Sequence, residues 1–217
     1  VLKTPYLSIG PKLIEFEKYF KNYITIRQCL SHMTGIESPE GGFLKNIMER
    51  RKFSTLEEEV NAFAARKIRA NPGTDFWYSS IGLNIAGRVI EVISKKKFEV
   101  VIKQKLFTPL GMTKTTFAAA ENGGPVNPSG GAKSTADDYM KFLVMLLNNG
   151  RYNGVQVLSE NAVNEMRKVQ NTLEQIKFAP KSAEGYTYAS GSWVVEKKTD
   201  TVTIIHEGPD KPNPYYT

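Results

Sequence analysis

Two hydroxyl-bearing side chains that could take part in catalysis, Tyr78 and Ser80, stand two positions apart in the segment WYSSIG. The segment follows the turn NPGTDF, in which Pro72 and Gly73 supply fixed and positive backbone dihedrals. It precedes LNIAGRVIEVI, whose apolar residues recur at helical spacing. A loop that enters a buried helix often holds functional side chains. The alternative is structural, with Ser80 as a helix cap and Tyr78 in the core.

The sequence contains one Ser-x-x-Lys spacing, Ser94 to Lys97, and we do not expect this pair to be catalytic. In some acyl-transfer enzymes such a pair supplies a nucleophilic serine and a lysine that helps to remove its proton. Here the spacing falls in SKKK, at the polar end of the predicted helix. A run of lysines is typical of a solvated face, so we interpret the match as coincidental.

No other group of side chains has the spacing of a metal or cofactor site. Cys29 falls on the apolar side of a predicted helix and is expected in the core. Asp137 and Asp138 follow a Ser-Thr pair and are interpreted as first-turn carboxylates that the helix dipole favours. His206 lies in a β-branched segment, where it is either a hydrogen-bonded sheet residue or part of a site. We therefore expect neither a metal nor a cofactor.

The composition argues against several classes of protein. Of the 217 residues, 41% are hydrophobic and 24% are charged, which is typical of a globular domain, so we expect one domain over residues 1–217. The net charge of +7 is scattered apart from SKKK and two nearby lysines, so no nucleic-acid partner is expected. No apolar run approaches the ~18 residues that a membrane span needs. The single cysteine cannot form an internal disulfide.

Helix signals dominate the first part of the sequence and predict a helical lobe over about residues 11–170. One amphipathic helix begins near Leu83, and another covers FEVVIKQKLF and ends at TPLG. Helix starts are also predicted from capping patterns at Thr25 with Gln28, Ser54 with Glu57, Ser134 and Ser159.

Strand patterns come late, in YTYASGSWVV and TVTIIHEG, which are β-branched and aromatic and are separated by polar EKKTD. They predict a β-hairpin over about residues 186–207. Helices first and strands last indicate an α+β fold. A two-stranded hairpin is marginal by itself, so the sheet needs further strands, which the sequence does not obviously supply.

Five segments in order resemble the signatures of one protein family: ITIRQCLSHMTGI, FWYSSIGLNIAGRVIE, LFTPLGMTKTTF, NPSGGAKSTADDYMKFLVMLLNNG and HEG. Each is weak alone, but their order is specific. The chain resembles the penicillin-recognising serine hydrolases, which include class C-like β-lactamases, D-alanyl-D-alanine carboxypeptidases and related esterases. The resemblance covers Ile24 to Gly208. It implies a β-lactamase/DD-peptidase-like fold, with a helical lobe packed on an antiparallel sheet.

The resemblance also implies roles for individual residues. In this family acyl transfer proceeds through a serine ester formed by a Ser-x-x-Lys pair. Tyr78 would be the catalytic proton carrier, and His206 the polar or cationic catalytic group on a closing strand. Ser80 and Gly208 would bind substrate, the glycine by letting it lie close to the backbone. We expect Tyr78, Ser80 and His206 to line one cleft. The family uses no catalytic histidine in LSHMTG, so His32 is interpreted as structural.

Three features depart from the family pattern. The family's Ser-x-x-Lys precedes the tyrosine, so we expect the pair before Val1 and expect this chain to be a fragment truncated at both ends. Ser80 stands where asparagine is frequent, which favours simple esters or peptides over β-lactams. Pro209 lacks an N–H where the family draws an oxyanion donor, and one such donor is worth about 10²–10³ in rate.

The favoured hypothesis is a serine hydrolase that acts on an ester, a peptide or a β-lactam through an acyl-enzyme. The alternative is a non-catalytic relative that binds peptides or cell-wall fragments in the same cleft. Either way the expected partner is a small-molecule or peptide ligand, and the sequence does not indicate an oligomeric state. The resemblance implies a periplasmic or secreted location, although no signal segment is visible. An upstream Ser-x-x-Lys helix would distinguish the enzyme from the binding module.

Overall fold

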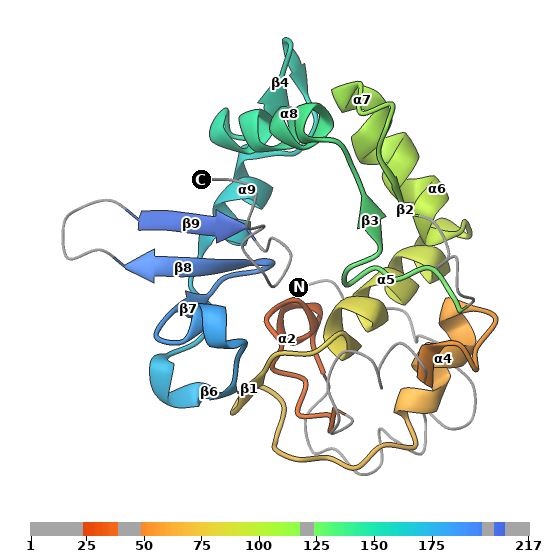
Figure 1. Ribbon diagram of the computed structural model, residues 1–217, viewed down its shortest axis with the longest axis vertical. Coiled ribbons are helices and arrows are strands. Elements are labelled where there is room, and N and C mark those ends of the chain that lie inside the picture. The colour runs from red at the N-terminus through yellow and green to blue at the C-terminus, as the bar shows by residue number, and fades with distance from the viewer. Residues whose placement is uncertain (1–23, 39–48, 118–123, 197–201, 207–217) are drawn as a thin grey trace.

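The computed structural model describes residues 24–38, 49–117, 124–196 and 202–206 (Figure 1). Among the described residues, helices are the longest elements as far as α9 (Glu160–Arg167), and the last strands form an antiparallel sheet. The predicted α+β class is confirmed, and the β structure is divided among several small sheets. No helix in the described ranges is long and apolar enough to cross a bilayer.

Helix α5 (Ile81–Ser94) is central to the helical part and packs against α2 (Ile26–Leu30), α4 (Leu56–Phe63) and α6 (Phe98–Ile102) (Figure 1). The close approach of α2 and α5 depends on Gly82. A Cβ atom built at this position would lie 2.2 Å from the carbonyl oxygen of Cys29, well inside van der Waals contact. Glycine therefore lets the start of α5 lie directly on the α2 backbone.

Replacing Gly82 by alanine should lower the free energy of unfolding by about 1–3 kcal/mol, because the new methyl group meets backbone rather than a movable side chain. Urea unfolding measures the change. Gly130→Ala is the matched control, because its Cβ would have no neighbour closer than Asn127 Nδ2 at 3.7 Å. We expect that variant to stay within about 0.5 kcal/mol of the parent. Equal losses in the two variants would contradict the packing argument.

The capping box predicted at Thr25 and Gln28 is confirmed: the Gln28 N–H donates to Thr25 Oγ1 at 3.2 Å, and the Thr25 N–H donates to Gln28 Oε1 at 2.8 Å. The Ser159 cap of α9 is also confirmed. At α4 the prediction was wrong by one residue. Thr55 is the N-cap in place of Ser54 and accepts from the Glu58 N–H. Two hydroxyl residues in succession offer either start, and the hydrogen bond from the Glu58 N–H identifies Thr55 as the cap.

Helix α8 (Ala136–Leu147) shows the same one-residue error. Thr135 is its N-cap, whereas the predicted cap, Ser134, places its hydroxyl 2.7 Å from that of Thr115. Asp138 lies in the first turn, as expected, but is buried. It accepts from the Lys114 N–H at 2.7 Å and pairs with Lys141 at 2.8 Å, and these contacts hold its pKa below the usual range. The Asp138 carboxylate therefore connects the segment that contains Lys114 to α8 through hydrogen bonds.

The segment FEVVIKQKLF is helical as predicted. It comprises α6 and then a π-helical stretch, η1 (Lys103–Phe107). The short helix α7 (Thr108–Leu110) follows and ends at Gly111, which has a φ of +64°. This positive φ favours glycine and stops the helix where TPLG was expected to end it.

The predicted hairpin is confirmed, and a third strand joins it. Strands β8 (Ser192–Glu196) and β9 (Val202–His206) pair antiparallel from Ser192 opposite His206 to Glu196 opposite Val202. The start of YTYASGSWVV forms a separate strand, β7 (Thr187–Tyr188), on the other edge of β8. A sequence interpreted as one long strand is therefore two short strands joined by a tight turn at Ser190 and Gly191.

Other strand pairs are short. They are β1 (Phe76–Trp77) parallel to β6 (Ile176–Phe178), β2 (Thr116–Phe117) with β3 (Ala132–Lys133), and β4 (Arg151–Tyr152) with β5 (Val155–Gln156). Two 3₁₀ turns flank β6, η2 (Leu173–Gln175) and η3 (Lys181–Ala183). The β1–β6 pair matters for the site, because it joins the segment before Tyr78 to a part of the chain about a hundred residues later.

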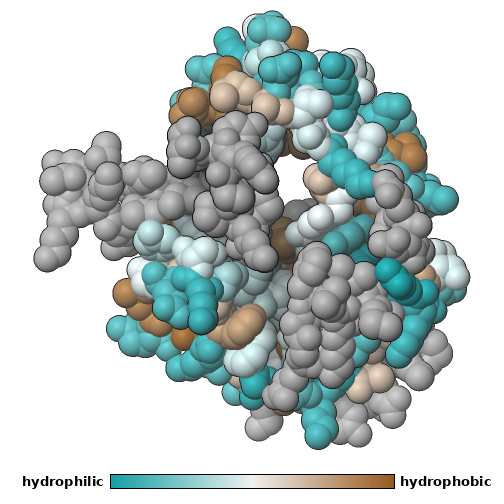
Figure 2. Space-filling view, in the orientation of Figure 1, coloured by the Kyte–Doolittle hydropathy of each residue, from teal (hydrophilic) through white to brown (hydrophobic). Residues whose placement is uncertain are grey.

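Buried side chains in the described residues gather in separate clusters rather than in one core. One lies between α4 and α5, one surrounds Phe107, and a third, aromatic cluster lies between β1 and β8. Figure 2 shows a largely hydrophilic face that is hollowed between α8 and β3. The aromatic cluster consists of Met33, Phe76, Ala183, Tyr188 and Trp193, with Tyr78 partly buried against it.

Candidate active site

Tyr78 lies where β1 ends and the chain turns into α5. Its backbone N–H donates to the carbonyl oxygen of Phe178 on β6 at 3.1 Å, so the β1–β6 pairing holds the loop. Its half-buried ring lies in the aromatic cluster, with ring centroids 4.6 Å from His32 and 5.6 Å from Trp193. The tyrosine is therefore anchored by backbone and ring contacts at the edge of the core.

His32 lies beneath the Tyr78 loop and contacts it at several atoms. The Ser79 N–H donates to His32 Nδ1 at 3.3 Å, and the Trp77 N–H donates to the His32 carbonyl oxygen at 2.9 Å. The other ring nitrogen, Nε2, lies 3.1 Å from the hydroxyl of Tyr188 on β7. Only 3% of His32 is exposed, in agreement with its interpretation as a structural residue. Its link to the tyrosine loop was not predicted.

Burial lowers the pKa of His32 from 6.5 to about 4, because the imidazolium form would lose its hydration. The unfolded state therefore binds a proton more tightly than the folded state between these values. Neutral His32 therefore contributes fully to the free energy of unfolding above pH 6.5, and this contribution is lost as the pH falls from 6.5 toward 4. Lowering the pH from 7 to 4 should reduce the free energy of unfolding by about 3 kcal/mol through this residue.

Urea unfolding across this pH range, on the parent and on His32→Asn, isolates the contribution of His32 from that of the carboxylates. Asparagine tolerates a positive φ and carries no titrating group. We expect the parent to lose about 3 kcal/mol more than the variant between pH 7 and pH 4. Parallel losses in the two proteins would show that folding does not lower the pKa of His32.

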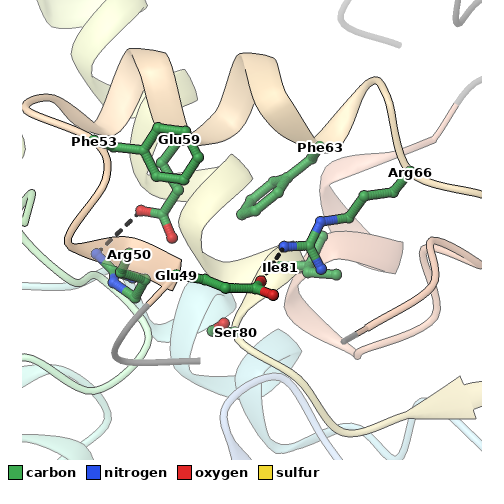
Figure 3. Close-up of a pocket in the computed structure, with 8 residues that line it drawn as sticks. All are labelled: Glu49, Arg50, Phe53, Glu59, Phe63, Arg66, Ser80 and Ile81. Carbon is green, nitrogen blue, oxygen red and sulfur yellow. Dashed lines mark hydrogen bonds and ion pairs between the residues drawn. The ribbon is translucent and has the colours of Figure 1, made fainter. Parts of the chain in front are cut away.

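Ser80 occupies the N-cap position of α5, but its side chain makes no capping hydrogen bond. It lines a cavity of about 20 Å³, room for about one water molecule, between residues 49–53, α4 and the start of α5 (Figure 3). The structural interpretation of Ser80 was therefore right about position and wrong about the hydrogen bond. The cavity is lined by Glu49, Arg50, Phe53, Glu59, Phe63, Arg66, Ser80 and Ile81.

A buried ion pair forms one wall of this cavity (Figure 3). Arg50 Nη2 lies 3.0 Å from Glu59 Oε2, close enough to pair but without hydrogen-bond orientation. Asn84 Nδ2 donates to Glu59 Oε1 at 3.2 Å. Burial raises the pKa of Glu59, and the charge of Arg50 opposes that rise. Arg66 and Glu49 form a second pair across the cavity at 3.4 Å.

The same groups fasten the loop that contains NPSGG. Arg50 donates to Asn127 Oδ1 at 2.7 Å and to the carbonyl oxygens of Pro125 and Val126 at 3.2 and 3.0 Å. Asn84 Oδ1 accepts from the Ser129 N–H at 3.1 Å. The network thus joins residue 50, α4, α5 and this loop around Ser80. Sequence reasoning did not find it, because Glu59 and Arg50 lie in ordinary charged, amphipathic segments.

His206 is the last residue of β9, and its backbone pairs with Ser192 on β8. The next residue on β8, Trp193, contacts the ring of Tyr78. The end of β9 is therefore one strand away from the residue that packs on the tyrosine. Gly208 and Pro209 lie outside the described residues. The catalytic roles of Tyr78 and His206 and the substrate-binding roles of Ser80 and Gly208 stay predictions.

The geometry of Ser94 agrees with a coincidental Ser-x-x-Lys match. Ser94 ends α5, and its hydroxyl contacts the backbone N–H and carbonyl of Lys96 at 3.3 and 3.4 Å. Lys95 has a φ of +55°, so the chain turns before Lys97, which has extended dihedrals at the start of α6. The two side chains therefore do not share a helical face.

Cys29 is buried as predicted, and burial raises the pKa of its thiol to about 12, so it is not a thiolate nucleophile at neutral pH. In the part of the chain that the structure describes, no group of three or more His, Cys, Asp or Glu side chains could hold a metal ion.

The sequence profile of the beta-lactamase family matches residues 4–217. This chain belongs to the beta-lactamase family. Among curated relatives, Protein Rv1367c of Mycobacterium tuberculosis is 27% identical over 184 residues, which cover 70% of this chain and 46% of the relative. The chain therefore spans about half the length of that relative.

Solved structures agree with the family. A protein from Bacteroides dorei DSM 17855 superimposes with a TM-score of 0.64 at 28% identity, covering 85% of this chain and 56% of that chain. The D-amino acid amidase of Ochrobactrum anthropi SV3 shares the fold with a TM-score of 0.59 at 19% identity, covering 83% of this chain and 56% of that one. The β-lactamase/DD-peptidase-like fold expected from the sequence is confirmed.

Proposed function

We propose that this chain forms the tyrosine-bearing part of a serine hydrolase that cleaves an ester or a peptide-like amide through a serine ester. The observation that carries the proposal is the anchoring of Tyr78. In a member of the beta-lactamase family, this tyrosine is held by β6 through its backbone and by His32 and Trp193 through its ring. A proton carrier needs such fixed geometry, because proton transfer requires hydrogen-bond distances.

In the proposed reaction a serine hydroxyl from a Ser-x-x-Lys pair elsewhere in the full-length protein attacks the substrate carbonyl. The phenol of Tyr78 relays the proton of that serine to the leaving group, so the serine ester forms as the alcohol or amine departs. Water then attacks the carbonyl of the serine ester, one of its protons passes through Tyr78 to the serine oxygen, and the carboxylic acid leaves as the serine hydroxyl re-forms. His206 would contact a substrate carboxylate, Gly208 would allow close approach to the backbone, and Ser80 would supply a hydroxyl near the site.

The substrate class is proposed from two observations. Ser80 offers a hydroxyl rather than an amide for a substrate amide group. One protein with this fold is a D-amino acid amidase. Both favour small esters or peptide-like amides over β-lactams, and a periplasmic or secreted location would suit such substrates.

A second function, binding of peptides or cell-wall fragments without catalysis, is favoured by Pro209. Proline has no N–H to donate to an oxyanion. Loss of one such donor lowers the rate by about 10²–10³, which would leave a binding protein with little turnover.

The test compares the 217-residue chain with the full-length protein that contains it. The chain alone should hydrolyse neither nitrocefin nor p-nitrophenyl acetate above background, because its Ser-x-x-Lys match is misplaced. The full-length protein should be labelled by a fluorophosphonate on a serine outside residues 1–217. An adduct on Ser94, or turnover by the chain that is lost on mutating one of its serines, would refute the proposal. Failure to label any serine in the full-length protein would favour the binding function.

A further inference from the structure

His32 has a backbone conformation that requires support from its surroundings. Its φ is +56°, a region that side chains with a Cβ seldom adopt. The other non-glycine residues with positive φ in the described ranges are Lys95, Asn149 and Asn153, and all three are exposed. Among these four described residues, His32 alone combines this conformation with burial. Such strain persists where neighbouring contacts impose it, and here those contacts are with the Tyr78 loop and the sheet.

We propose that His32 is a positioning residue for Tyr78: its imidazole and carbonyl group hold residues 77–79 from beneath and so fix the orientation of the phenol. This inference rests on the proposed role of Tyr78. Trp77 and Ser79, on either side of the tyrosine, both donate backbone hydrogen bonds to His32, at 2.9 and 3.3 Å. The imidazole ring packs against the ring between them, with centroids 4.6 Å apart.

The hydrogen bonds also assign the tautomer. A backbone N–H can only donate, so Nδ1 must carry a lone pair and the proton must be on Nε2. The Nε2–H then donates to the hydroxyl of Tyr188, at 3.1 Å. Tyr188 lies on β7 opposite Trp193 of β8, and their ring centroids are 4.9 Å apart. His32 therefore connects residues 77–79 to β7, which pairs with the strand whose Trp193 contacts the ring of Tyr78.

The position demands a side chain with an acceptor toward the loop, a donor toward the sheet and a flat ring between them. Neutral histidine meets all three demands, and no other side chain of this length does. The interaction spans 156 residues of sequence, so it joins the start of the helical part to the closing sheet. A change at His32 should therefore alter the geometry of Tyr78.

The first measurement uses the parent chain alone. Histidine side-chain ¹⁵N spectra distinguish a bare from a protonated ring nitrogen, and we expect His32 to show bare Nδ1 and protonated Nε2 at pH 7. The opposite tautomer would break the hydrogen bond from Ser79 and overturn the proposal without any variant.

The second measurement uses a pair of variants. His32→Asn keeps an acceptor near the place of Nδ1 and tolerates positive φ, whereas His32→Gln moves its polar atoms toward the place of Nε2. Hydrogen exchange of the Ser79 amide should be about tenfold faster in His32→Gln than in the parent, because one hydrogen bond is lost. His32→Asn should restore exchange to within about threefold of the parent. The ring resonances of Tyr78, assigned with Tyr78→Phe, should shift in the same order.

Tyr188→Phe is the control for the sheet side. It removes the hydroxyl that faces Nε2 and keeps the ring, so Ser79 exchange should stay within about threefold of the parent while the resonance of His32 Nε2 shifts. Urea unfolding of each variant separates local opening of the loop from global loss of stability. The proposal would be wrong if the Ser79 amide exchanged at the same rate in the parent and in His32→Gln. It would also be wrong if His32→Asn did not restore the slower rate.

The enzyme assay separates this inference from the proposed function. In the full-length protein, His32→Gln should lower kcat for ester hydrolysis about tenfold or more and change KM by less than about twofold, because a displaced proton carrier slows chemistry rather than binding. If the ¹⁵N spectra and the Ser79 exchange rates match the expected results but the full-length protein has no hydrolase activity, the positioning role of His32 is supported and the proposed function is wrong. If activity is present and His32→Gln leaves kcat unchanged, the positioning role fails.

Discussion

Replacing Tyr78 by phenylalanine in the full-length protein should slow formation of the acyl-enzyme by about 100-fold or more. General acid–base groups contribute about 10²–10⁴ to a rate, and this change deletes the one group that would carry the proton. The ring remains, so its contacts with His32 and Trp193 are kept and the fold should survive. Stopped-flow measurement of the p-nitrophenol burst from p-nitrophenyl acetate reports the acylation step directly.

Tyr186→Phe is the matched control for this prediction. Tyr186 is half-buried against the same aromatic cluster, and its replacement by phenylalanine removes the same hydroxyl group. Its burst rate should stay within about twofold of the parent, because Tyr186 has no part in the proposed reaction. A loss in Tyr78→Phe no larger than that in Tyr186→Phe would show that the phenol of Tyr78 does not carry the proton.

Replacing Glu59 by glutamine should lower the free energy of unfolding by about 3–5 kcal/mol. The side chain of Glu59 is 2% exposed and that of Arg50 is 14% exposed, so the change leaves a buried guanidinium without its counterion. Because Arg50 also donates to the carbonyl oxygens of Pro125 and Val126, the loop before β3 should loosen as well. Urea unfolding gives the loss of stability, and amide exchange in the loop gives its location.

The same helix supplies the control. Glu57 pairs with Arg88 at 2.7 Å, a shorter distance than in the buried pair, but its side chain is 53% exposed. Glu57→Gln should therefore cost less than about 1 kcal/mol, because water solvates the Glu57 carboxylate and Arg88 keeps Glu91 as a second partner at 3.1 Å. Similar losses for Glu57→Gln and Glu59→Gln would mean that burial of the Arg50–Glu59 pair does not determine its contribution.

Features that depend on residues close together in the chain were predictable. The capping box of Thr25 and Gln28 involves atoms three residues apart, and only residues 197–201 separate β8 from β9 in the sequence. The order of the family signatures placed Tyr78 in the loop that enters α5. Even here the local signal has limited precision. At α4 and α8 two adjacent hydroxyl residues competed as caps, and the hydrogen bonds of Thr55 and Thr135 decided the helix starts.

The surroundings of the site could not be predicted, because they join residues that are distant in sequence. His32 meets Tyr188 across 156 residues, Arg50 meets Asn127 across 77, and β1 pairs in parallel with β6. Sequence periodicity shows that a side chain is apolar or charged, but not which partner its burial will select. Composition, the Thr25 and Ser159 caps, α+β class and family thus follow from the sequence alone. The tertiary structure alone decides that a strained, neutral histidine lies under Tyr78 and that Ser80 borders a buried ion pair, because desolvation and hydrogen bonding depend on which distant groups pack together.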